Sequence, residues 1–153
     1  MDKKVSILYL IIGDLLYYLI TYNFTMWKFN PIGFDKHIYA NHVLITLGID
    51  FINFPAVVLL YLGNYPDRKS ITLQAIYIMC WSALNSILEY IFFIVSGVSY
   101  DNGWNFWWSA SFNILLYTLL RIHHLRPLLA WLISAAIPLL YCYFFKLPLN
   151  SMK

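Results

Sequence analysis

The sequence predicts an all-α integral membrane protein, a single bundle of about five transmembrane helices. Of its 153 residues, 61% are hydrophobic and only 11% are charged, and the mean hydropathy is +0.66. Water-soluble chains carry about 25% charged residues. Apolar stretches of the ~20 residues that cross a bilayer recur along the chain, joined by short connectors. We therefore expect one domain over residues 1–153, with the lipid bilayer as its surroundings.

The five helices are predicted from the apolar stretches and the polar residues that flank them. The predicted spans cover residues 5–22, 38–62, 71–97, 106–122 and 128–145. The first span follows Asp2, Lys3 and Lys4, and both its length and the acidic Asp14 within it argue against a cleaved signal peptide. Pro127 suits the first turn of the last helix, where a missing amide hydrogen bond costs little.

The connectors between the spans have the composition of loops and turns. Residues 23–37 are polar with interleaved aromatic side chains, which favours a loop in the headgroup layer. Residues 64–67 and 101–103 indicate tight turns, because they are rich in Asn, Asp, Pro and Gly. Neighbouring helices are therefore expected to run antiparallel.

The basic residues predict which end of the bundle faces the cytoplasm, because Lys and Arg favour that side. With the N-terminus inside, the cytoplasmic end holds Lys3, Lys4, Arg68, Lys69, Arg121 and Arg126. The other end then holds Lys28, Lys36, Lys146 and Lys153. We expect a cytoplasmic N-terminus and an outside C-terminus. The basic run 121–126, which includes His123 and His124, is interpreted as a solvated anchor at the membrane surface.

Three of the seven acidic residues lie within predicted spans, namely Asp14, Asp50 and Glu89. A charged group at the centre of a membrane helix costs about 2.5 to 3.5 kcal/mol on insertion scales, so such residues face the bundle interior or a wet cavity. These acids are therefore the first candidates for a functional site.

Helical spacing groups other polar residues with these acids, because residues three or four apart share one face. The predicted stripes are His42, Thr46, Asp50 and Asn53; Ser82, Asn85 and Glu89; and Asn105, Ser109 and Asn113. The predicted buried polar site consists of Asp14, Asp50, Glu89, Asn85, Asn113, His42 and Asn53. Asp101, Asn105, Trp104 and Trp108 are expected to form its outer rim. The sequence thus predicts a polar cavity that opens outward.

The chemistry of this site follows from the absence of lysine and arginine at midspan. The acids must be protonated, hydrogen-bonded or neutralised by a bound cation. Oxygen ligands suit protons, Mg²⁺ or Ca²⁺, and a set of His42, Asp50 and Glu89 would favour Zn²⁺ or Mn²⁺, so a divalent cation is a candidate cofactor. The alternative is that the acids and amides only bond across helices and fix their packing. A structural role for His42 is equally compatible with the pattern.

Several strings of the sequence resemble a known family. They are Gly13-Asp14-Leu15-Leu16-Tyr17, Asn41-His42, Asn64-Tyr65-Pro66, Glu89-Tyr90, Phe112-Asn113, Pro127-Leu128-Leu129-Ala130-Trp131 and, most specifically, Tyr100-Asp101-Asn102-Gly103-Trp104-Asn105-Phe106-Trp107-Trp108. Together they cover most of the chain and resemble an uncharacterised family of small multi-span membrane proteins from Bacillus and Clostridium relatives. The resemblance implies a Firmicute source and a bacterial plasma-membrane location, but no activity.

Three functions are compatible with the predicted site. The first is a small transporter, channel or carrier for a cation, proton or small polar solute, with a homo-oligomer expected because five helices make a thin pore wall. The second is an intramembrane enzyme acting on a lipid-linked substrate, with His42 and an acid as acid-base pair or metal ligands. The third is a sensor or accessory subunit whose partner protein the sequence does not name. Nucleic-acid binding is excluded, because the net charge of +3 comes from scattered anchors and not from a basic patch.

Overall fold

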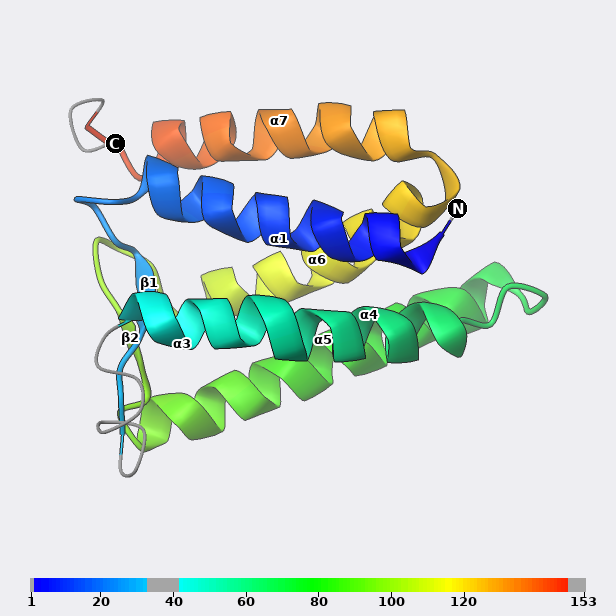
Figure 1. Cartoon of the computed structure of the whole chain (residues 1–153), viewed down its shortest axis with the longest axis horizontal. Helices are drawn as coiled ribbons and strands as arrows, with labels where there is room; N and C mark the ends of the chain where they lie inside the picture. The colour runs from blue at the N-terminus through cyan, green and yellow to red at the C-terminus, as the bar shows by residue number, and fades with distance from the viewer. Residues whose placement is uncertain (1, 33–41, 149–153) are drawn as a thin grey trace.

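The computed structural model describes residues 2–32 and 42–148, apart from the side chains of His42 and Val43. Within these residues the chain is mostly helical and forms five helices (Figure 1). They are α1 (Lys3–Ile20), a composite helix of α3 (His42–Gly48), η1 (Ile49–Asn53) and α4 (Phe54–Gly63), then α5 (Ile71–Ile94), α6 (Phe106–Leu125) and α7 (Pro127–Phe144). The prediction of a helical chain with about five helices is confirmed.

Helices α1 and α6 begin after residues whose side chains cap free amides, and α7 begins at a proline. The Asp2 carboxylate accepts from the Lys4 amide at 3.0 Å, so α1 begins two residues before the predicted span. The Asn105 side chain accepts from the amides of Trp107 and Trp108 at the start of α6. Pro127 is the first residue of α7, as its missing amide predicts.

The second helix contains a π-helical segment, η1, that the sequence analysis did not predict. The amide of Phe54 donates to the carbonyl of Ile49, five residues back rather than four. This wider turn changes the phase of the side chains that follow. The α-helical stripe predicted from His42 to Asn53 therefore does not hold: Asp50 is fully buried and Asn53 is exposed.

A two-stranded antiparallel sheet closes one end of the bundle. Strand β1 (Trp27–Phe29) pairs with β2 (Val98–Tyr100), with Trp27 opposite Tyr100 and Phe29 opposite Val98. The sequence analysis placed β1 in a headgroup loop and extended the third span to residue 97. The helix ends at Ile94 instead, because Ser96 adopts a φ of 62° and the Gly97 amide turns back to the Phe92 carbonyl.

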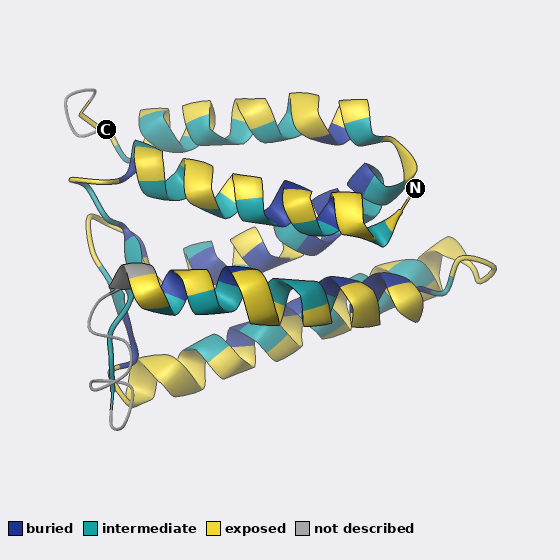
Figure 2. Ribbon diagram, viewed as in Figure 1, coloured by how far each residue is buried: buried dark blue, intermediate teal, exposed yellow. Residues whose placement is uncertain are grey.

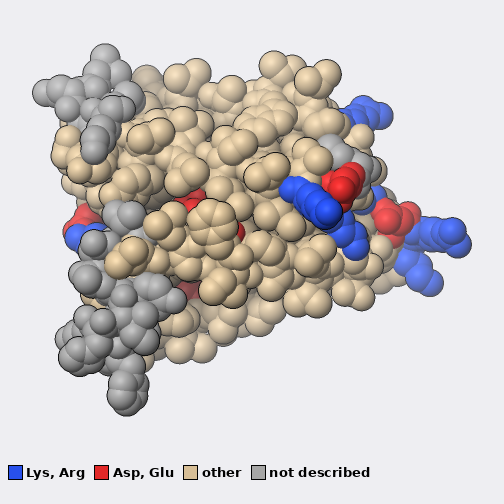
Figure 3. Space-filling model, in the orientation of Figure 1, with Lys and Arg blue, Asp and Glu red and all other residues tan. Residues whose placement is uncertain are grey.

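The helix order around the bundle places α6 at the centre. Helix α6 packs against α1, α5 and α7, and α1 also packs against α4. The N-terminus lies at one end of the bundle, together with the α4–α5 and α6–α7 connections, and the sheet lies at the other end (Figure 1). On the face drawn in Figure 3, basic and acidic side chains gather mainly at the N-terminal end.

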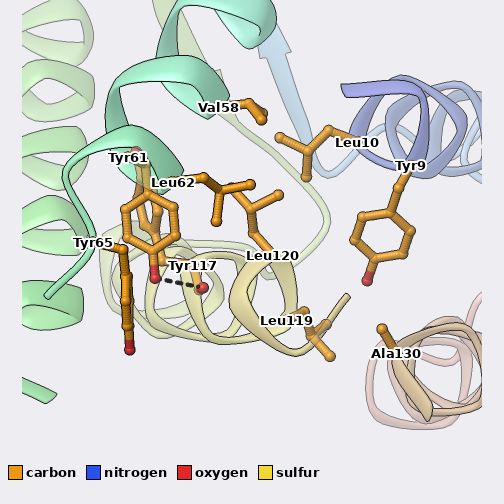
Figure 4. Packing of buried hydrophobic residues seen from close by; sticks show 10 residues of the cluster. All are labelled: Tyr9, Leu10, Val58, Tyr61, Leu62, Tyr65, Tyr117, Leu119, Leu120 and Ala130. Carbon is orange, nitrogen blue, oxygen red and sulfur yellow. Dashed lines mark hydrogen bonds between the residues drawn. The ribbon is translucent and has the colours of Figure 1, made fainter. Parts of the chain in front are cut away.

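The described core lies at the N-terminal end of the bundle. Tyr61, Tyr117, Leu120 and Val58 are fully buried there (Figure 4). The Tyr61 hydroxyl donates to the Tyr117 carbonyl at 3.0 Å, and the two rings lie 5.0 Å apart. These aromatic contacts tie α4 to α6.

Much of the remaining helical surface is apolar and exposed, as the yellow outer faces in Figure 2 show. Three helical segments are long and apolar enough to cross a membrane: Leu44–Gly63, Ile71–Ile94 and Pro127–Phe144. At most 22% of such a window is buried within the chain. The apolar residues of these helices therefore face outward, as in a protein surrounded by lipid.

Candidate functional site

A cavity of about 660 Å³ lies between the helices, toward the end that carries the sheet. All five helices and both strands contribute to its lining. Most lining residues are apolar. The polar ones are Tyr9, Asp14, Tyr17, Thr21, Asn30, Thr46, Asn53, Asn85, Glu89, Ser109, Asn113, Ser134 and Tyr141, with the indoles of Trp27 and Trp104. Figure 3 shows acidic atoms recessed between tan side chains in the middle of this face.

The sheet closes its end of the cavity through the carboxylate of Glu89. The Trp27 indole N–H donates to Glu89 Oε1 at 2.9 Å, and the Tyr100 hydroxyl donates to the same oxygen at 2.7 Å. Burial and the neighbouring carboxylate raise the pKa of the Tyr100 phenol above its ordinary value, so the phenol stays protonated and donates. Glu89 therefore joins α5 to both strands.

Helix α1 holds the same strand from the other side. The Tyr17 hydroxyl accepts from the Trp27 amide at 3.0 Å and donates to the Trp27 carbonyl at 3.2 Å. Strand β1 is thus fixed to α1 through its backbone and to α5 through an indole. Because Trp27, Phe29 and Val98 also line the cavity, the two strands form its end wall.

Asp14 differs from Glu89 in having no protein partner. Its carboxylate lines the cavity from α1, and within residues 2–32 and 42–148 it makes no hydrogen bond or ion pair. The amides of Asn53 and Asn85 also line the cavity without a side-chain hydrogen bond in the described part of the chain. Thr46 is only 9% exposed, and its buried hydroxyl likewise has no described partner. Of these four residues only Thr46 is buried, and a buried polar group is nearly always hydrogen-bonded, so its hydroxyl points to a ligand or ordered water. Asp14 and Asn85 are half-buried and Asn53 is exposed, so their polar groups are open to the cavity.

The polar residues of α6 are already paired with protein groups. The Asn113 amide donates to the Ser86 hydroxyl at 3.1 Å, and the Trp104 indole donates to the Ser109 hydroxyl at 2.9 Å. Asn113 is buried and fixes α6 against α5. These residues shape the cavity wall, and their hydrogen-bonding capacity is largely used.

Asp50 lies apart from the cavity lining. It has no exposed surface, and neither carboxylate oxygen has a hydrogen-bond partner among the described residues. A charge buried in this way is very costly, so we expect this carboxyl to be neutral. Asp50 nevertheless lies one helical turn from Thr46, which is also buried and lines the cavity, and near enough to Asp14 for the two carboxyl groups to interact electrostatically.

The proposed metal ligands and outer rim have different outcomes. Among the described residues, no group of three or more His, Cys, Asp or Glu side chains could hold a metal ion. The side chain of His42 lies outside the described residues, so its part in the candidate set stays a prediction.

Of the predicted rim, Trp104 is buried against the cavity, Asn105 caps α6, and Asp101 pairs with Lys28 at 3.1 Å. Trp108 stacks near Trp104 without lining the cavity.

Sequence reasoning missed a buried histidine at the other end of the cavity. His123 was interpreted as part of a solvated anchor, but it is fully buried, 3.3 Å from the Ser6 hydroxyl and stacked on Tyr9 at 4.1 Å. The Tyr9 hydroxyl in turn lies 2.5 Å from Ser134, and both line the cavity. The sequence does contain a pattern that indicates this burial, because His123 continues the α6 face of Tyr117 and Leu120 at helical spacing.

Comparisons of the chain with protein-family models, with curated proteins and with solved structures found no match. The case for a function therefore depends on the cavity itself.

Proposed function

We propose that this chain is a multi-pass protein of the bacterial plasma membrane that binds and carries a small, positively charged organic solute in the cavity between its helices. The observation that supports the proposal is the carboxylate of Asp14, which has no partner among the described residues and lies in a largely apolar cavity of about 660 Å³. Ligand pockets typically have volumes of about 300 to 1,000 Å³, apolar walls and a few well-placed polar groups.

The charge of the lining favours a cation. Asp14 and Glu89 line the cavity, and no Lys, Arg or His stands among the described residues that do so. A positively charged group can pair with the Asp14 carboxylate and donate to the amides of Asn53 and Asn85. The rings of Tyr17 and Trp27 add aromatic faces, which attract cations.

An organic cation fits this cavity better than a bare metal ion. Mg²⁺, Ca²⁺ and Zn²⁺ require several oxygen, nitrogen or sulfur ligands around one point. The described residues bring no such set of acidic, histidine and cysteine side chains together. The volume also exceeds what one ion needs. The intramembrane enzyme and the sensor remain hypotheses that no specific contact in the described residues favours.

The membrane arrangement belongs to the same proposal. In it, α1 and α6 cross the bilayer together with the three apolar helices, and the N-terminal end with its basic residues faces the cytoplasm. The sheet then lies at the outer surface, as the wall between the cavity and the outside. Exchange of solute with the outside requires this wall to move, and this motion makes the protein a carrier and not an open pore.

The binding step can be tested with detergent-purified protein and two probes, butylammonium and tetramethylammonium chloride at pH 7. A ligand that binds only the folded state raises stability, by about 2.7 kcal/mol at one hundred times its Kd. We expect at least one probe to raise the unfolding temperature of the wild type but not of Asp14→Asn. Asp101→Asn is the matched control, because this carboxylate lies outside the cavity, and it should respond as the wild type does.

The carrying step needs a second measurement, the uptake of the same radiolabelled probe into liposomes containing the protein. We expect uptake with the wild type and with Asp101→Asn, and none with Asp14→Asn. If no organic cation shifts the unfolding temperature, or if Asp14→Asn responds fully, the proposed binding is wrong. Binding without uptake would reject the carrier and favour a sensor.

A further inference from the structure

The cavity wall has an apolar side that continues into the outer surface of the bundle. Leu88 and Phe92 of α5 line the cavity, and each still leaves 46% of its surface exposed. On the opposite side the lining includes Ile45 and Ile49 of the second helix. Residues of both helices thus connect the cavity with the surface that faces lipid in a membrane.

The two helices on either side of this wall separate toward the sheet. At the N-terminal end Tyr77 of α5 donates to the Tyr61 carbonyl of α4 at 3.0 Å, and their rings stack 5.5 Å apart. Farther along, α5 packs mainly against α6 and β2, and α3 packs against β1. Figure 1 shows α3 and α5 diverging toward the sheet.

The polar groups without partners mark where a headgroup would lie. Asp14 lines the cavity from α1, and the buried Thr46 hydroxyl, also without a described partner, lies in α3. The described lining contains no cationic side chain that could pair with a phosphate. A phospholipid headgroup would leave its phosphate unpaired here, at a large cost in free energy. An ammonium group without a phosphate has no such penalty.

From these observations we infer that the ligand is an amphiphile with an ammonium headgroup, no phosphate and an alkyl chain, which reaches the cavity sideways from the bilayer between α3–η1 and α5. Its ammonium group pairs with Asp14 and its chain lies against Leu88 and Phe92. This inference rests on the proposed function and names the class of solute that the cavity takes.

The first test compares probes with wild-type protein in phosphatidylcholine nanodiscs. The probes are dodecylamine, butylamine, dodecanoate and phosphatidylethanolamine, which separate the charged head, the chain and the phosphate. Binding is measured as a shift in unfolding temperature and by native mass spectrometry. We expect dodecylamine to bind about tenfold or more tightly than butylamine, and dodecanoate and phosphatidylethanolamine not to bind. Asp14→Asn should weaken dodecylamine binding about tenfold or more, as expected for a lost charge-assisted hydrogen bond.

A second test places a bulky side chain in the sideways opening. Leu88→Trp should lower the affinity for dodecylamine about tenfold. Leu84→Trp is the matched control, since Leu84 lies one turn earlier on α5, is 48% exposed and does not line the cavity. Equal affinities in the two variants would reject the sideways route, provided both unfold at the wild-type temperature.

Different experimental results would contradict the amphiphile inference and the proposed function. Equal binding of butylamine and dodecylamine, both lost in Asp14→Asn, would overturn the amphiphile and leave the proposed function standing. Tight binding of phosphatidylethanolamine would show that the ligand is a membrane lipid and overturn the phosphate-free class. Failure of every ammonium compound to bind would overturn both proposals.

Discussion

At the N-terminal end of the bundle, Tyr61, Tyr117 and Leu120 have no exposed surface, whereas toward the sheet the same helices enclose a cavity of about 660 Å³. In the packed half, the hydroxyls of Tyr61 and Tyr77 donate to backbone carbonyls of neighbouring residues. In the hollow half, Asp14 and Asn85 line the cavity without such partners. The two halves therefore differ in how closely their side chains pack, and not in polar pairing alone, because the buried Tyr117 hydroxyl and His123 Nε2 of the packed half also have no described partner.

The largest expected effect on stability comes from replacing one leucine by alanine in each half and comparing the two losses. Leu120→Ala should lower the free energy of unfolding by about 2 to 4 kcal/mol, because it leaves a void that the closely packed side chains around it cannot fill. Leu88→Ala, at a residue 46% exposed beside the cavity, should cost less than about 1 kcal/mol. Denaturation of both variants in one detergent measures the difference. Equal losses would mean that the two halves are packed alike.

The hydrogen bond between Trp27 and Glu89 tests how firmly the sheet closes the hollow half. Trp27→Phe keeps a ring but removes the donor to Glu89 Oε1, and should destabilise the sheet by about 1.5 kcal/mol. The matched control is Trp107→Phe, because Trp107 is 76% exposed and its indole makes no hydrogen bond among the described residues. Hydrogen exchange of the β1 and β2 amides should accelerate in the first variant only. Unchanged exchange would show that the Glu89 contact does not hold the sheet.

Replacing either of two glycines in the cavity lining by alanine should change the stability by a smaller amount, and the two changes should have opposite signs. A Cβ at Gly13 would meet no atom within 4 Å, so Gly13→Ala should stabilise α1 by about 0.5 to 1 kcal/mol. A Cβ at Gly97 would lie 3.0 Å from Phe92 and 3.1 Å from Ile32, so Gly97→Ala should destabilise by about 1 kcal/mol. Thermal unfolding of the two variants checks both signs. A loss of stability in Gly13→Ala would mean that α1 is packed closely at this point.

The smallest effect is expected at the exposed ion pair beside the sheet. Lys28 and Asp101 lie 3.1 Å apart but are 41% and 50% exposed, so Asp101→Asn should cost less than about 0.5 kcal/mol and nothing at high salt. Asp67→Asn should cost more, because its partner Arg121 is only 14% exposed and lies over the Tyr65 ring at 4.1 Å. The free energies of unfolding of both variants, measured at low and at high salt, distinguish the two ion pairs.

The sequence was informative where helical periodicity is regular. Asp14, Asn85, Glu89 and Asn113 were assigned to inward faces, and all four line the cavity. Apolar length and flanking polar residues also located the starts of α1, α5, α6 and α7 to within two residues. The predicted start of the second span, residue 38, lies outside the described residues. Periodicity alone does not give the partners of a side chain, so it did not distinguish the hydrogen-bonded Glu89 from the free Asp14.

Three features could not be predicted because they depend on contacts between distant residues or on irregular backbone. Strands β1 and β2 have three residues each and pair across about seventy positions, so neither shows a strand pattern of its own. The π-helical segment η1 lies between the buried Thr46 and the exposed Asn53 of one predicted stripe, and no local signal marked it. His123 lies in a basic run, and this hid its continuation of a buried face.

The central position of α1 and α6 has a consequence for how the protein is made. These two helices pack against each other, and neither is among the three that are apolar enough to cross a membrane alone. Helix α1, with Asp14 in its sequence, is synthesised before the other described helices, whereas α6 is followed only by α7 among them. If the chain crosses the membrane as proposed, we expect the insertion machinery to retain α1 until later helices are available to shield its carboxylate, so that α1 is buried only after α6 has been made.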